Sequence, residues 1–293
     1  MSEDLTRIER LAMAAGRFMN EDDRGKRLQG HWLRSVSWWW VRPALTRRMY
    51  TEGLEELLAL RPERGVLMVS NHRSFFDQFA IMLAAWADKA PWSRDLYFPV
   101  RANFFYEHPL GMAVNYFVGA GVMYPPIFRQ RERAALNDDA LDTIMRFLDR
   151  PGAVVGVHPE GRRNPGEDPY TFLPAQPGVG KIALHARPTI IPVFINGLSN
   201  DFVGDVRANY AKDIRRTRPV IAVYGKPMDL SDLYAQKPRP TLYKKAADRF
   251  MAEIARLGER EREIRARCLA GEVADDDPHW IQSRPVHKLY ARL

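Results

Sequence analysis

An imidazole and a carboxylate lie close together in the segment Asn71–Asp77, directly after the apolar run Val66–Ser70. A run of this length is typical of a buried strand, so His72 and Asp77 should emerge where a strand ends. Active sites of α/β sheets lie at such ends. An imidazole has an unperturbed pKa of about 6.5 and can accept a proton at neutral pH. The carboxylate can hold the ring in one tautomer and stabilise the imidazolium that forms.

No serine or cysteine with a recognisable nucleophile context lies near this histidine in the sequence. We therefore interpret His72 as a base that activates the hydroxyl of a substrate, with Asp77 as its partner. The plainer alternative is that the two residues are an accidental pair and that Asp77 only caps a helix.

A second polar segment, Val157–Asn164, follows another predicted buried strand, Ala153–Gly156. We expect it at the same edge of the sheet as the His-Asp pair. Gly161 permits a tight turn in which the backbone approaches a ligand closely. Arg162 and Arg163 follow it, and a guanidinium is the best planar partner for phosphate. The segment therefore predicts a phosphate-binding turn beside the base.

Two other patterns near this turn support weaker interpretations. His158 stands at the strand end and is a candidate for contact with the substrate. A metal site made of His72, His158 and Glu160 is conceivable, but the spacing of these ligands is not diagnostic. The segment Gln176–Lys181 lacks the Walker spacing and has Ile182 at the Ser/Thr position, so it indicates a helix start.

Strand-like and helix-like patterns alternate along most of the chain. The predicted strands are 65–70, 95–100, 118–124, 153–158, 189–196 and 219–224. The predicted helices are 5–19, 74–88, 132–149, 177–187 and about 240–267. This alternation predicts an α/β fold with a mostly parallel central sheet and helices on both of its faces. The tail after Gly271 lacks periodicity and is expected on the surface.

Composition limits the classes of protein to consider. The 293 residues are 46% apolar and 27% charged, as in ordinary globular proteins. The net charge of +8 favours an anionic partner, such as a membrane surface, a phosphorylated substrate or a nucleic acid. No nucleic-acid-binding module is recognisable, so we predict no nucleic-acid partner. One cysteine, no signal-peptide pattern and no run of about 18 apolar residues favour a cytoplasmic protein that does not cross a membrane.

Residues 24–50 combine basic and aromatic character in a way that suits a bilayer surface. They carry seven Lys or Arg, no acid, and four tryptophans: Trp32, Trp38, Trp39 and Trp40. Tryptophan beside cations on a helix fits the headgroup region of an anionic membrane. The alternative is that these rings pack on the protein's own core. Pro43 is expected to break or kink the helix.

Three segments of the sequence, taken in their order and spacing, resemble the glycerolipid acyltransferase family, of the lysophosphatidic acid acyltransferase type. Asn71–Asp77 matches that family's His-x4-Asp signature. Pro159–Arg163 is similar to its Pro-Glu-Gly-Thr-Arg block, with Arg162 in place of threonine. Pro188–Val193 matches its closing strand, and the resemblance covers about residues 50–225.

The resemblance implies roles for individual residues. His72 would be the general base and Asp77 its partner. The phosphate of the acceptor would be bound by four residues: Arg129, Glu160, Gly161 and Arg163. Arg131 competes with Arg129 for this role, because the family's second block is spaced differently here.

The implied activity is transfer of a fatty acyl group from acyl-coenzyme A or acyl-carrier protein to the hydroxyl of a lysophospholipid, such as 1-acyl-glycerol 3-phosphate, in phospholipid biosynthesis. No cofactor is expected beyond the thioester co-substrate, and no metal. The protein would be peripheral on the inner face of an anionic membrane. The alternatives are an acyltransferase for another lipid or metabolite alcohol, and a non-catalytic lipid-binding protein of the same fold.

These expectations divide the chain into three parts. Residues 1–49 would be a helical, membrane-associating segment, and residues 50–240 an α/β acyltransferase domain. Residues 241–293 would be a C-terminal helix followed by a surface tail.

Overall fold

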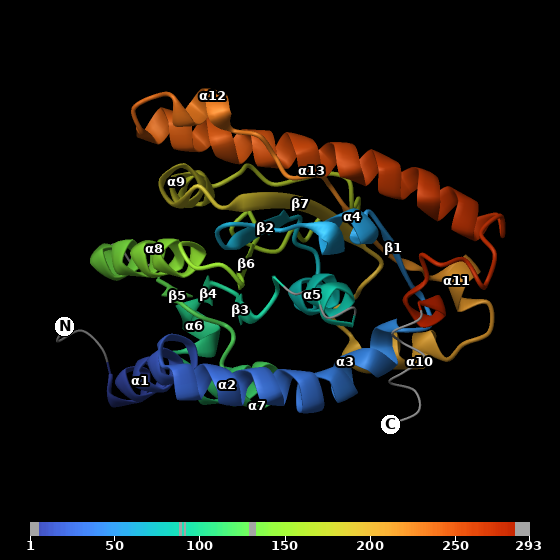
Figure 1. The fold of residues 1–293 in the computed structure, drawn as a ribbon. Helices are drawn as coiled ribbons and strands as arrows, with labels where there is room; N and C mark the ends of the chain where they lie inside the picture. The colour runs from blue at the N-terminus through green and yellow to red at the C-terminus, as the bar shows by residue number, and fades with distance from the viewer. Residues whose placement is uncertain (1–5, 88–89, 91, 129–132, 285–293) are drawn as a thin grey trace.

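A six-stranded sheet forms the centre of the computed structural model, which describes residues 6–87, 90, 92–128 and 133–284 (Figure 1). In sheet order the strands are β1 (Met49–Glu52), β8 (Val220–Tyr224), β7 (Thr189–Asn196), β2 (Val66–Ser70), β6 (Ala153–Val157) and β3 (Asp95–Tyr97). Neighbouring strands are parallel except β7 and β8, which are antiparallel. The predicted α/β fold with a mostly parallel sheet is confirmed.

Helices cover both faces of this sheet, which explains why the strands are apolar throughout. All residues of β2 and β8 are buried, as expected for strands packed on both sides. One face is covered by α8 (Ala134–Leu148), α9 (Pro177–Ala186) and α13 (Pro240–Leu269). The apolar residues of α13 that recur at helical spacing, among them Phe250, Ile254 and Leu257, are buried.

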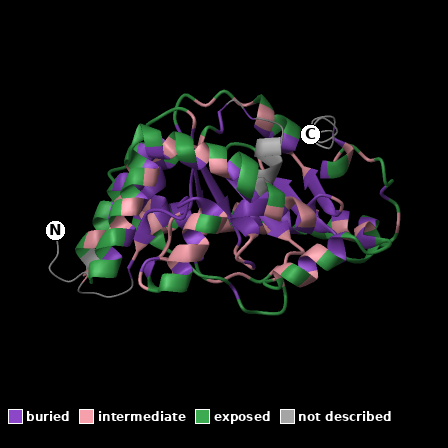
Figure 2. Ribbon diagram, turned by 90° about the horizontal axis from the view of Figure 1, so that it is seen from below, coloured by how far each residue is buried: buried purple, intermediate pink, exposed green. Residues whose placement is uncertain are grey.

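The opposite face is covered first by α4 (Leu54–Ala59) and α5 (Asp77–Ala87). Beyond them lies a set of elements that we call the lower layer, after its place in Figure 1. It comprises α1 (Arg7–Glu21), α2 (Asp23–Trp32), a π-helical turn (Leu33–Ser37), α3 (Trp38–Leu45), α6 (Ala102–Phe105), α7 (Pro109–Gly119) and α10 (Phe202–Asn209). Figure 2 shows buried residues concentrated in the strands and exposed residues on the outer helices.

Short elements complete the fold. They are the paired strands β4 (Val100–Arg101) and β5 (Pro126–Ile127), the helices α11 (Ile214–Thr217) and α12 (Ser231–Tyr234), and a 3₁₀ turn at Ile281–Ser283.

Most predicted elements are found, with one clear error. The predicted strands other than 118–124 correspond to β2, β3, β6, β7 and β8, although β3 is shorter, and the predicted helices to α1, α5, α8, α9 and α13. The strand predicted over 118–124 is wrong, because α7 extends to Gly119. His108 caps this helix with its side chain, and Pro109 occupies the first turn, where proline is favoured.

The expectation of a surface tail after Gly271 is also wrong in part. Trp280 and Ile281 are fully buried. Trp280 forms an antiparallel bridge with Tyr50, and the Thr51 N–H donates to the carbonyl oxygen of His279 (2.9 Å). The tail therefore covers the outer edge of β1, which would otherwise present unpaired backbone groups.

The tryptophans of the N-terminal segment divide between the core and the surface. Trp40 is half-buried among Phe76, Phe79 and Phe202, and its indole N–H donates to the carbonyl oxygen of Val118 (3.2 Å). Core packing, the alternative interpretation, is therefore correct for this ring.

Other groups of the same segment are held or exposed in different ways. The Trp32 indole also bonds to a carbonyl near the end of α7, that of Phe117 (3.1 Å). Trp39, in contrast, is 68% exposed. The Trp38 side chain lies outside what the structure describes.

The N-terminal segment consists of several short helices. Pro43 lies within α3, which ends two residues later at Leu45, and the departure from α geometry comes earlier, in the π-helical turn Leu33–Ser37. Within the described ranges, no helix is both long enough and apolar enough to cross a bilayer.

Candidate active site

The two polar segments meet at one edge of the sheet, as predicted. Strands β2 and β6 are parallel neighbours, so Ser70 and Val157 end side by side. The rings of His72 and His158, which follow these ends, are stacked with centroids 3.7 Å apart and planes only 4° from parallel. Residues far apart in the sequence thus form a single site.

His72 and Asp77 form the predicted pair. The Nδ1 atom of His72 lies 3.2 Å from Oδ2 of Asp77, which is almost fully buried. The same carboxylate oxygen accepts from the backbone N–H groups of Arg73 (2.7 Å) and Ser74 (2.8 Å). A carboxylate only accepts, so Nδ1 carries the proton and donates it, which leaves Nε2 as the basic atom. Asp77 also holds the turn before α5 through these two bonds, but it accepts from residues that precede the helix and so does not cap it. Its catalytic role stays a prediction.

The electrostatics of the pair favour the form that a base requires. Burial, the largest cause, and the positive charges of Arg163 and Arg101 together lower the pKa of His72 to about 3. Burial raises the pKa of Asp77 to about 6. At neutral pH, His72 is therefore neutral and Asp77 is ionised.

Glu160 links the base to the neighbouring loop. Its Oε1 accepts from the backbone N–H of His72 (3.0 Å) and its Oε2 from that of Leu173 (2.8 Å). The side chain is almost fully buried, and burial raises its pKa. Because amides engage both oxygens, Glu160 fixes the backbone at His72 and Leu173. Its role in binding the phosphate of the acceptor stays a prediction.

Gly161 makes a turn that only glycine tolerates easily. Its φ is +67°, and an added Cβ would lie 2.8 Å from Cγ of Gln176. Its carbonyl oxygen accepts from both Nε and Nη2 of Arg101 (3.1 and 2.6 Å). Arg101, which the sequence alone does not distinguish from a structural or surface cation, is thus held at the site by the predicted turn.

Arg163 is exposed beside the base, and its Nη1 donates to Oδ1 of Asn200 (2.8 Å). This partner is neutral, so the interaction orients the guanidinium without balancing its charge. The same Oδ1 accepts from the backbone N–H of Phe75 (3.0 Å). Asn200, which follows β7, was missed by the sequence analysis because no pattern marks it. Arg129 and Arg131 lie outside the described residues.

A cavity of about 720 Å³ adjoins these groups. Its polar lining includes Arg101, His158, Glu160 and Arg162, and its apolar lining includes Leu141, Ile144, Val179 and Ile182 of α8 and α9. In the part of the chain that the structure describes, no group of three or more His, Cys, Asp or Glu side chains could hold a metal ion. The arrangement thus combines a base, guanidinium groups and an apolar cavity.

Fold and site together define an α/β protein with a His-Asp pair at the carboxyl edge of its sheet. Residues 27–196, more than half of the chain, match the family described as Acyltransferase, and the chain belongs to that family.

The solved structures that match include the 1-acyl-sn-glycerophosphate (LPA) acyltransferase PlsC from Thermotoga maritima. The two sequences are 15% identical, the match covers 85% of this chain and 96% of that one, and the TM-score is 0.47. No match is found among curated proteins.

Proposed function

We propose that this protein is an O-acyltransferase that acts on a lysophospholipid such as 1-acyl-glycerol 3-phosphate, with acyl-coenzyme A or acyl-carrier protein as donor, in phospholipid biosynthesis. The observation that carries the proposal is the neutral His72, bonded through Nδ1 to Asp77 and lying beside Arg163. The family assignment supplies the reaction class.

The chemistry follows from the free Nε2 of His72. This atom takes the proton of the acceptor hydroxyl, and the oxygen attacks the thioester carbonyl. The new C–O bond forms, the C–S bond breaks, and the imidazolium returns its proton to the leaving thiolate. Asp77 remains ionised and stabilises the imidazolium between the two transfers. In the proposal, the acceptor phosphate binds Arg163 and Arg101, and an acyl chain occupies the cavity lined by α8 and α9.

Bound phosphate would also strengthen the base. The charges of Arg163 and Arg101 help to keep the pKa of His72 low. An anionic group placed between these arginines offsets their charge, so the pKa of His72 rises toward its ordinary value. A phosphorylated acceptor would therefore react faster than a neutral alcohol that binds equally well.

Release of free thiol from acyl-coenzyme A or acyl-carrier protein tests the proposal. Purified protein should release thiol with 1-acyl-glycerol 3-phosphate and much less with the matched monoacylglycerol, which lacks the phosphate. No release with any phosphorylated acceptor, including glycerol 3-phosphate, would refute the proposal.

A different acceptor alcohol is the second candidate. Arg162 is exposed next to Arg163, and two adjacent guanidiniums suit a larger or more anionic headgroup. The same thiol assay, run with a panel of lipid and metabolite alcohols, ranks the acceptors. Turnover with any of them would exclude a purely lipid-binding role.

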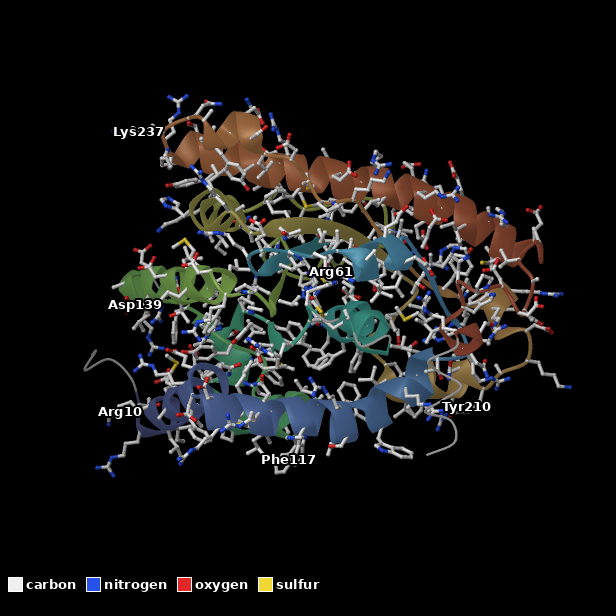
Figure 3. All side chains as sticks on the ribbon, viewed as in Figure 1. Arg10, Arg61, Phe117, Asp139, Tyr210 and Lys237 are labelled. Atoms are coloured by element: carbon white, nitrogen blue, oxygen red, sulfur yellow. The ribbon has the colours of Figure 1, made fainter. Side chains whose placement is uncertain are left out.

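We also propose that the protein is peripheral on the inner face of an anionic membrane. Within the described residues, eleven of the twelve large exposed apolar side chains lie on or beside the lower layer. They are Ile8, Leu11, Phe18, Leu28, Val36, Trp39, Phe104, Leu110, Phe117, Val203 and Tyr210, and the twelfth is Leu269 of α13. Figure 3 places Phe117 and Tyr210 on the lower side of the molecule. Exposed apolar side chains gathered on one layer in this way favour an interaction surface there.

The charges around this apolar face fit an anionic bilayer. Leu28, Val36 and Trp39 follow one another at helical spacing, and the exposed Arg24, Arg27 and Arg34 lie on the same segment. Apolar burial combined with basic flanks is the usual mode of interfacial binding.

Flotation with vesicles that contain anionic lipid tests the membrane proposal. Replacement of Trp39, Leu110 and Phe117 by serine should reduce binding at least tenfold. Leu269→Ser is the matched control on the other side of the molecule and should bind normally. Equal flotation of the triple variant and the control would refute the proposal.

A further inference from the structure

His158 lies face to face with the base, but the acyl-transfer steps above do not use it. Its ring is parallel to that of His72 at 3.7 Å, which is close contact over the whole imidazole face. The only hydrogen bond from the ring of His72 to the described residues is the one to Asp77. One hydrogen bond leaves the ring free to swing about that contact, so the stacked ring is the second constraint on its plane.

The edges of the His158 ring are held at both nitrogens. Nδ1 lies 3.1 Å from the carbonyl oxygen of Ser70 and 3.1 Å from its Oγ. Nε2 lies 3.1 Å from the amide Nε2 of Gln78. An amide nitrogen donates, so Nε2 of His158 accepts, and its proton is on Nδ1, where it is donated to the Ser70 carbonyl. These partners favour neutral His158 in one tautomer.

A glycine in the strand makes room for this arrangement. Gly156 lies in β6, and a Cβ added there would lie 2.2 Å from Oε1 of Gln78. Gln78 is buried, and no group of the described residues hydrogen-bonds to its Oε1. Burying an amide oxygen without a partner costs free energy, so the amide is kept there for what its nitrogen does. That nitrogen bonds to His158.

We propose that His158 is a positioning residue for the base: it fixes the plane of the His72 ring, so that Nδ1 stays on Asp77 and Nε2 stays toward the acceptor, and it remains neutral while His72 is protonated. Gln78 and Gly156 act one step further away, by holding His158. The positioning stands on the contacts alone, whereas the benefit to turnover rests on the function proposed above.

Two physical effects support this assignment. A second cation stacked on an imidazolium would oppose its formation, and burial together with the charge of His72 lowers the pKa of His158 to about 3. A base that is misplaced by about 1 Å can lose on the order of 100-fold in rate, so a restraint on the ring plane has a large effect on turnover.

His158→Ala and His158→Phe form the test, with Gln78→Leu as a variant that keeps both rings. In His158→Ala, kcat should fall by about 10- to 100-fold, while KM for acyl-coenzyme A and for 1-acyl-glycerol 3-phosphate changes less than about threefold. Phenylalanine restores a flat ring and should recover a large part of kcat. Gln78→Leu should lower kcat several-fold. Thermal unfolding of each variant checks that the fold is intact.

The ring of His72 gives a readout that does not need turnover. In ¹⁵N NMR spectra, assigned by the loss of signals in His72→Ala, the parent protein should show a single tautomer protonated at Nδ1. His158→Ala should show an average of two tautomers. If His158→Ala changes only KM, then His158 merely lines the cavity and the proposal is wrong. If the variant leaves both kcat and the tautomer of His72 unchanged, the proposal is also overturned. If the parent protein shows no turnover at all, the proposed function fails, and the NMR comparison still decides the positioning.

Discussion

The site has two halves that are built differently. In the half that contains the base, Asp77 and Glu160 are almost fully buried and both accept from backbone amides. In the half that contains the arginines, Arg162 and Arg163 are exposed, and the bonds described for Arg101 and Arg163 go to a carbonyl and an amide oxygen. Under the proposed function, the first half is preorganised for proton transfer, whereas the second presents positive charge to the acceptor phosphate. Substitutions in the first should therefore change kcat, and those in the second should change KM for the acceptor.

His72→Ala should have the largest effect. Loss of a general base typically lowers the rate by 10²- to 10⁴-fold, so we expect kcat for thiol release to fall by about 1,000-fold. KM and the thermal midpoint should change little. Retention of the parent kcat would contradict the role of His72.

Asp77 should give a smaller effect with a distinctive pH dependence. Its pKa is raised to about 6, so the carboxylate takes up a proton as the pH falls through that value and can no longer stabilise the imidazolium. For the parent, kcat/KM should therefore fall below about pH 6. Asp77→Asn should lower kcat by about 100-fold, and its remaining activity should lack this acidic limb. If kcat/KM of Asp77→Asn still falls below about pH 6, the titrating group is not Asp77.

Arg163→Gln tests the other half of the site. Removing a charge-assisted hydrogen bond costs about 1.5–3 kcal/mol, so KM for 1-acyl-glycerol 3-phosphate should rise about tenfold or more. Because glutamine remains polar and kcat depends on the other half, kcat should stay within a few-fold. Monoacylglycerol serves as the control: it has no phosphate contact to lose, and removing the charge that holds the pKa of His72 down should leave its weak turnover unchanged or raise it. A loss confined to kcat would contradict the division into halves.

The smallest effect is expected at Asn200, which contacts both halves. Asn200→Ala removes the acceptor for Arg163 and for the Phe75 amide. Loss of a neutral hydrogen bond costs about 0.5–1.5 kcal/mol, so KM for the acceptor should rise only a few-fold. Steady-state kinetics with varied acceptor concentration would measure this KM. A rise in KM as large as that of Arg163→Gln would mean that Asn200 itself contacts the acceptor.

The sequence predicted the first half of the site better than the second. His72 and Asp77 are local to one turn, and the apolar runs before them and before His158 indicated two strands that end at one edge. Arg101 ends β4 and Asn200 lies in the loop after β7, so their positions depend on how these two strands are placed, which no short pattern encodes. Glu160 was identified as a site residue, but burial gave it two backbone partners, and burial depends on tertiary packing.

The lower layer shows the same limit of prediction from the sequence. Helical spacing identified a basic, tryptophan-rich segment, but not which ring would face the protein. Trp40 packs inside and Trp39 outside, because α7 lies against one side of the segment. That helix was itself predicted in part as a strand, since its apolar C-terminal residues fit either period.

The four residues between His72 and Asp77 include Phe75 and Phe76. The ring of Phe76 packs against Trp40 and Phe202, with centroid distances of 6.0 and 5.3 Å. The ring of Phe75 packs against Phe105, with a centroid distance of 5.8 Å. The turn that carries the base is therefore anchored in the lower layer, and the two should open and close as one cooperative unit in hydrogen exchange. A chain shortened to begin at β1 would retain every strand of the sheet and still lose Trp40, one of the rings against which the turn of the base packs.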